Sequence, residues 1–134
     1  MSLGITQAAI DTIVAHTESE RPRECCGLLV GTAQTILKAI PVENGAVDPF
    51  RQYEIDPAVY LAEIKRSRDE GHAVVGAYHS HPRGAAEPSP TDLEQAFKGF
   101  VFLIAGNLHD GEVDLRAFVL GEDAAFEEVT LTPM

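Results

Sequence analysis

The chain of 134 residues is 45% apolar, which suits one compact domain, residues 1–134, around one hydrophobic core. Its 21 acidic and 10 basic residues give a net charge of -11, which argues against a protein that holds nucleic acid by neutralising phosphates. The sequence has no long uncharged apolar run and no secretory signal pattern at its start, so we expect a cytoplasmic protein that does not cross a membrane.

The first half of the chain is predicted to begin with a helix over residues 5–17, capped by Thr6 and ended by a charged loop. The elements expected next are a buried strand at 25–31, a neighbouring strand at 35–42, a turn at Asn44-Gly45 and a short strand at 53–56.

The second half alternates in the same way. A helix is predicted from Pro57 to about Glu70, with Asp56 as its cap and Gly71 as its end. The remaining elements are a strand at 73–79, a loop at 81–88, a helix at 90–98, strands at 100–105 and 113–120 joined by a turn at His109-Asp110-Gly111, and a last strand at 126–131. This order predicts an α/β (α+β) domain built around a mixed sheet.

The two cysteines, Cys25 and Cys26, are adjacent and lie in an apolar run. Neighbouring cysteines bridge only with strained geometry and close no useful loop, so we expect buried free thiols. Zinc ligation by one of them stays open, as does a cysteine nucleophile assisted by His79 or His81.

Two histidines at the end of a predicted strand indicate a metal site. A catalytic zinc takes three protein ligands at roughly 2 Å and keeps a fourth place for water. Side chains two apart on a strand share a face, so His79 and His81 can reach one ion, and Pro82 ends the strand directly after them. Asp92, in the first turn of the next helix, can return over the strand end as the third ligand.

The same residues also allow a purely structural interpretation. Ser89 and Asp92 are spaced as the cap and the reciprocal acid of a capping box, which requires no metal. A hydrolytic site would need a general base as well, and the pattern does not select among Glu24, Glu87 and Glu94.

Together, these segments resemble the signature of the JAMM (MPN-plus) metalloproteases. The matching parts are the run His79-Ser80-His81-Pro82, the pair Ser89 and Asp92 after six intervening residues, and the upstream strand Glu24–Gly31, which a glutamate opens. They stand in the family's order, and the predicted elements fit the family over nearly the whole chain.

The resemblance implies a role for each matching position. The ligands of one Zn²⁺ per chain would be His79, His81 and Asp92. Glu24 would deprotonate the attacking water and pass the proton to the leaving amine, and Ser89 would donate a hydrogen bond to the developing oxyanion. Ser80 would be structural, with its side chain facing away from the metal.

The resemblance also implies a mixed, curved central β-sheet flanked by helices. The short chain is similar to the compact bacterial and archaeal members, which remove amino acids or peptides from the C-terminal glycine of ubiquitin-like or sulfur-carrier proteins. Their partner would lay a flexible Gly-Gly tail along a strand edge beside the zinc, and the domain would be able to pair as a homodimer. The alternatives are a non-catalytic scaffold of the same fold and a zinc hydrolase of a small-molecule amide.

Overall fold

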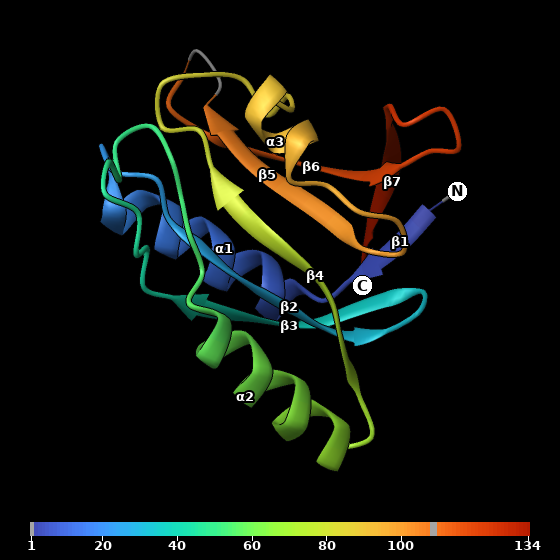
Figure 1. Ribbon diagram of the computed structural model, residues 1–134. Coiled ribbons are helices and arrows are strands. Elements are labelled where there is room, and N and C mark those ends of the chain that lie inside the picture. Colours follow the sequence, from blue (N-terminus) through green and yellow to red (C-terminus); the bar gives the residue numbers. More distant parts are fainter. Residues whose placement is uncertain (1, 108–109) are drawn as a thin grey trace.

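A computed structural model describes residues 2–107 and 110–134, and its strands form one sheet that closes on itself (Figure 1). The order is β1-β3-β2-β4-β5-β6-β7, with β1 lying parallel to both β3 and β7. The strands are β1 (Ser2–Ile5), β2 (Cys26–Thr32), β3 (Thr35–Val42), β4 (Ala73–Ser80), β5 (Val101–Asn107), β6 (Val113–Leu120) and β7 (Phe126–Pro133). Parallel β4–β5 pairing beside antiparallel β2–β4 pairing confirms the mixed, curved sheet.

Helices α1 (Gln7–Glu20) and α2 (Pro57–Asp69) pack against different faces of this sheet. On β2, Leu29 belongs to the core cluster that contains Ile13 of α1, whereas Leu28 belongs to the cluster against which Tyr60 of α2 packs. A strand covered on both faces needs apolar residues at every position, which explains the continuous apolar run of β2. Within the described residues, no helix has the length and apolar character needed to span a membrane.

The start of the chain differs from the prediction. Residues 2–5 form β1, and Ile5, predicted to lie on the helix, is a buried strand residue. The helix begins at Gln7, where Thr6 caps it as predicted by accepting a hydrogen bond from the N–H of Ala9, and it continues to Glu20 instead of ending at Thr17. A four-residue strand carries too few residues for a periodic signal, and its partners β3 and β7 are remote in the sequence.

Two further elements are corrected. Residues 53–56 form no strand and belong to the loop between β3 and α2. Helix α3 (Pro90–Glu94) ends before Lys98, because the chain leaves the helix at Gln95 and the ring of Phe97 packs against Phe100 and Phe102. The turn predicted at 109–111 falls partly outside the described residues, but Gly111 adopts the positive φ of 84° that such a turn favours.

Candidate metal centre

Strand β4 carries the two histidines to the edge of the core. It lies between β2 and β5, and His79 is its last residue but one, with only 2% of its surface exposed. His81 follows the strand, and its backbone N–H donates to the carbonyl of Ala105 on β5 (2.8 Å). The pairing of β4 with two neighbours therefore fixes the backbone of both histidines.

Helix α3 brings the carboxylate to the same place. The Ser89 hydroxyl accepts from the N–H of Asp92 (3.1 Å), and the Asp92 carboxylate accepts from the N–H of Ser89 (2.8 Å), so the predicted capping box is present. The capping box holds the Asp92 side chain and still leaves both carboxylate oxygens close to the histidines. Capping and metal ligation are therefore compatible at Asp92.

The three side chains lie close enough to share one metal ion. The Nε2 atoms of His79 and His81 are 3.0 Å apart; that of His79 lies 3.2 Å from Oδ1 of Asp92, and that of His81 lies 3.4 Å from Oδ2. Bonds of about 2.0–2.1 Å at tetrahedral angles place ligand atoms about 3.3–3.4 Å from one another. Among the described residues, these three form the group of acids, histidines or cysteines that could hold a metal ion, so the donor set fits zinc.

A contact behind His81 selects the tautomer that a ligand needs. Its Nδ1 lies 3.1 Å from the carbonyl oxygen of Ala85, an acceptor, so Nδ1 carries the proton. When His81 is neutral, its lone pair is therefore on Nε2, which faces Asp92. The loop that provides this carbonyl is itself anchored, because the side-chain amide of Asn107 donates to the carbonyl of Pro82.

The local electrostatics act differently on the three side chains. Burial lowers the pKa of His79, which favours the neutral imidazole that a metal requires. Burial alone would raise the pKa of Asp92, but hydrogen bonds with His79 and His81 hold it well below its usual range. Burial also acts to lower the pKa of His81, but the hydrogen bonds with Asp92 and the Ala85 carbonyl and the nearby charges of Asp92 and Glu24 together raise that pKa. Asp92 is therefore ionised, with His81 as its partner.

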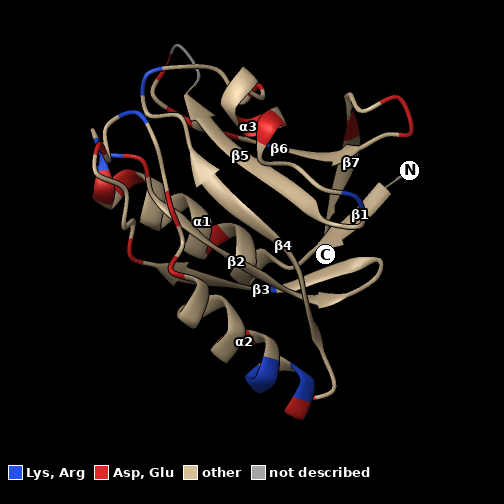
Figure 2. Ribbon diagram, in the orientation of Figure 1, with Lys and Arg blue, Asp and Glu red and all other residues tan. Residues whose placement is uncertain are grey.

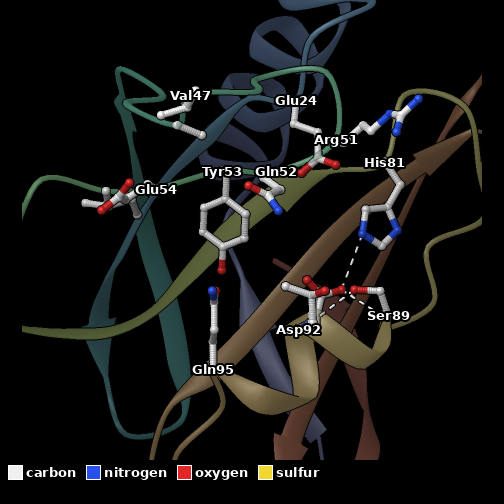
Figure 3. A pocket seen from close by; sticks show the side chains of 13 residues that line it. Glu24, Val47, Arg51, Gln52, Tyr53, Glu54, His81, Ser89, Asp92 and Gln95 are labelled. Atoms are coloured by element: carbon white, nitrogen blue, oxygen red, sulfur yellow. Dashed lines mark hydrogen bonds and ion pairs between the residues drawn. The ribbon is translucent and has the colours of Figure 1, made fainter.

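A cavity of about 810 Å³ opens beside this group, and Glu24, His81, Ser89 and Asp92 all line it. Figure 3 shows the Glu24 carboxylate pointing into the cavity from the side opposite α3, which presents Ser89 and Asp92. Burial raises the pKa of Glu24 to about 7, against a smaller lowering by His81. A carboxyl with this pKa exchanges protons readily near neutral pH.

The structure brings together all five residues selected from the sequence, whereas it keeps three others apart from the cavity. Ser80 faces away as predicted, because its buried hydroxyl accepts from the N–H of Cys25 (2.8 Å). The Cys25 thiol lies by Thr17, and the Cys26 thiol by the Val42 carbonyl. Burial raises the pKa of both thiols, that of Cys26 to about 12, which argues against a cysteine nucleophile.

One residue of the site is not apparent from the sequence. The ring of Tyr53 stacks on the imidazole of His79, with centroids 4.4 Å apart and planes at 18°. Tyr53 was placed in a predicted strand, and its contact with His79 depends on a long-range loop path.

The chain also matches known proteins. A family model described as prokaryotic homologs of the JAB domain matches residues 6–121. The chain is a compact prokaryotic member of the JAMM (MPN-plus) family. The five predicted site residues of this JAMM protein all lie within the matched segment.

Two relatives of this JAMM protein match it over most of their length. A desampylase of Haloferax volcanii is 38% identical over 109 residues, which are 76% of this chain and 78% of that protein. A probable TtuB-protein conjugate cleaving protease of Thermus thermophilus is 34% identical over 120 residues, 90% of this chain and 77% of that protein. The solution structure of protein DSY2949 from Desulfitobacterium hafniense has a TM-score of 0.85 at 26% identity, covering 98% of this chain and 92% of that one.

The charge distribution of this JAMM protein is uneven. Basic residues occur in the last turn of α2, where Arg66 and Arg68 lie, and acidic residues occur on α3 and in the loop between β3 and α2 (Figure 2). The lining of the cavity itself combines the acidic residues Glu24, Glu54 and Asp92 with the basic residue Arg51.

Proposed function

We propose that this protein is a zinc-dependent peptidase or isopeptidase. Its reaction would be hydrolysis of the amide bond after the C-terminal glycine of a ubiquitin-like or sulfur-carrier protein. The observation that carries the proposal is the grouping of His79, His81 and Asp92, whose ligand atoms lie within 4.8 Å of one another, beside the cavity that Glu24 lines. Two relatives support the substrate class: one is named a desampylase, and the other is named for cleaving TtuB conjugates.

In this proposal the metal is held by His79 and His81 through Nε2 and by Asp92 through its carboxylate. A zinc ion bound there supplies Lewis acidity toward a carbonyl oxygen and toward water. The contacts that orient both histidines are present without the metal. The Ala85 carbonyl accepts a hydrogen bond from His81, and the Tyr53 ring stacks on His79. The ligands therefore need little rearrangement to bind the ion.

Glu24 and Ser89 would carry the proton and the charge. Ionised Glu24 accepts a proton from the attacking water and delivers it to the leaving amine, which restores the carboxylate for the next cycle. Ser89 accepts a hydrogen bond from the N–H of Asp92, so its own hydroxyl hydrogen is free to point into the cavity. Donation of that hydrogen stabilises the oxyanion that forms as water attacks the carbonyl carbon.

The cavity also suits a glycine tail. It runs from Glu24 and His81 past the loop residues Gln52, Tyr53 and Glu54, which form its wall. Glycine has no side chain and few backbone restrictions, so a Gly-Gly tail can extend along this wall and bring its carbonyl close to His81 and Asp92. We therefore propose a Gly-Gly terminus as the partner.

The test uses a ubiquitin-fold carrier protein extended by two residues after its terminal Gly-Gly, with the products followed by intact mass. Zinc is measured in protein purified without added metal. We expect about one zinc per chain and release of the dipeptide, both lost in a His79→Ala, His81→Ala double variant. Cleavage that survives removal of zinc would contradict the mechanism, and binding of the carrier without cleavage would favour a scaffold. Hydrolysis of a short chromogenic amide alone would favour a small-molecule substrate.

A further inference from the structure

One side chain holds the loop that forms the wall of the cavity. Asn44 lies at the start of this loop, just after β3. Its Oδ1 accepts hydrogen bonds from the N–H groups of Ala46 (3.0 Å) and Glu54 (3.1 Å). Its Nδ2 donates to the carbonyl oxygens of Glu24 (3.0 Å) and Gln52 (2.9 Å). The amide thus uses two donors and both lone pairs of its oxygen at once.

Only one orientation of the Asn44 amide satisfies these four partners. Rotating the amide by 180° would place its NH₂ group against two N–H donors and its oxygen against two carbonyl oxygens. No other residue type of this length offers two donors and a double acceptor. Aspartate keeps the acceptor, and alanine keeps neither.

Through this network, Asn44 holds the backbone of Glu24. The carbonyl of Glu24 accepts from Asn44, and its N–H donates to the carbonyl of Pro49 in the same loop (2.8 Å). Both backbone groups of Glu24 are therefore bound to the loop. The direction in which the Glu24 side chain enters the cavity then depends on where the loop lies.

The same network places Tyr53. Its two neighbours in the chain, Gln52 and Glu54, both form hydrogen bonds with the Asn44 side chain. The carbonyl of Glu54 also accepts a hydrogen bond from the N–H of Gly45 (3.0 Å). The Tyr53 ring between them lies against His79. One amide thus links the carboxylate that lines the cavity to the ring that covers the buried histidine.

We propose that Asn44 is a positioning residue that sets Glu24 and Tyr53 relative to His79 for amide hydrolysis. This inference rests on the proposed function, because it assigns Glu24 as the base. Asn44 acts through Glu24 and Tyr53 rather than by touching the substrate. A misplacement of about 1 Å in a reacting group costs on the order of 100-fold in rate, so loss of the four bonds should lower kcat 10- to 100-fold.

The test compares Asn44→Ala and Asn44→Asp with a matched control, Glu43→Gln, at the exposed neighbouring position. With zinc in excess so that the metal site stays filled, both Asn44 variants should lower kcat on the Gly-Gly carrier substrate by about 10- to 100-fold with little change in KM. The Asp variant keeps an acceptor for Glu54 but turns an oxygen toward the Glu24 carbonyl, so it should not rescue activity. The control should behave as wild type.

Amide hydrogen exchange gives a readout that does not depend on turnover. The N–H of Glu24 should exchange faster in both Asn44 variants, whereas the N–H of Glu54 should lose protection only in the Ala variant. If Asn44→Ala does not fold, as judged by thermal unfolding, the Asp variant carries the test. Unchanged exchange at Glu24, or kcat within twofold of wild type in a folded variant, would overturn the role of Asn44. A wild-type protein that cleaves no carrier would overturn the proposed function instead, and exchange would still decide whether Asn44 holds Glu24.

Discussion

The ring of Tyr53 lies nearly flat on the imidazole of His79, at a centroid distance of 4.4 Å and an interplanar angle of 18°. His79 is the most buried of the three clustered side chains, and Tyr53 closes the face of it that would otherwise border the cavity. The stacking restricts rotation of the imidazole and excludes water from it. A side chain in the wall of the cavity therefore also orients a residue proposed to bind the metal.

This contact predicts that zinc binding depends on the ring of Tyr53 and not on its hydroxyl. Tyr53→Ala should weaken zinc binding by about 10-fold or more, because residues that orient a ligand typically contribute 10- to 100-fold to affinity. Tyr53→Phe keeps the stacked ring and should bind zinc as wild type does. Competition with a chromogenic chelator measures both. Equal affinities of the Ala and Phe variants would show that the stacking does not orient His79.

Removal of the carboxylate of Glu24 should separate catalysis from metal binding. Glu24→Gln keeps the shape of the side chain but cannot accept a proton, so kcat should fall by about 100- to 10,000-fold while zinc content stays that of wild type. Steady-state kinetics and metal analysis on the same preparation check this. If the Gln variant turns over at the wild-type rate, another group is the base.

Glu24→Gln should also change how the free energy of unfolding depends on pH. Burial raises the pKa of Glu24 from 4.5 to about 7, so the ionised side chain costs folding free energy. In zinc-free protein the cost is absent below pH 4.5, grows between pH 4.5 and 7, and is complete above pH 7. Glu24→Gln should therefore be more stable than wild type by about 1–2 kcal/mol at pH 8, after allowance for partial exposure, and equal to it at pH 4. Urea unfolding at both values of pH measures the difference, and a gap that does not depend on pH would contradict it.

A glycine of β2 should tolerate no side chain. A Cβ at Gly27 would meet the buried ring of Tyr78 and the carbonyl oxygen of Ile40, and backbone cannot move aside as a flexible side chain can. Gly27→Ala should lower the free energy of unfolding by about 2–4 kcal/mol. Gly84→Ala is the matched control, since among the described residues, its own chain neighbours aside, no heavy atom lies within 4 Å of its added Cβ. Thermal unfolding of the two variants side by side is the measurement, and equal stability would refute the steric argument.

The loop after His81 should depend on Asn107 at the end of β5. The side chain of Asn107 donates to the Pro82 carbonyl and accepts from Arg21, and its N–H donates to the Gly84 carbonyl (2.9 Å). Asn107→Ala removes both side-chain bonds and frees the loop that orients His81. We expect zinc affinity to fall by about 10-fold, and Arg21→Ala should produce a smaller fall. Wild-type affinity in Asn107→Ala would show that the Ala105 backbone suffices to hold His81.

The sequence alone allowed much of this protein to be anticipated, for reasons of local chemistry. The two-residue spacing of His79 and His81 at a strand end dictates a shared face, and the apolar run of β2 dictates a strand buried on both sides. The Ser89 and Asp92 pair predicted the capping box from spacing alone. The resemblance to the JAMM family then assigned Glu24, which no periodicity would have selected.

The tertiary structure decided the features that depend on residues remote in the sequence. Strand β1 exists because β3 and β7 provide its partners, and four residues carry no periodic signal by themselves. Residues 53–56 alternate like a strand but do not pair with a strand in the described structure. The Asn44 side chain instead accepts a hydrogen bond from the N–H of Glu54 and donates one to the carbonyl of Gln52. The stacking of Tyr53 on His79 follows from that loop path. Local sequence thus determined which groups can bind and react, whereas long-range backbone pairing determined which of them meet.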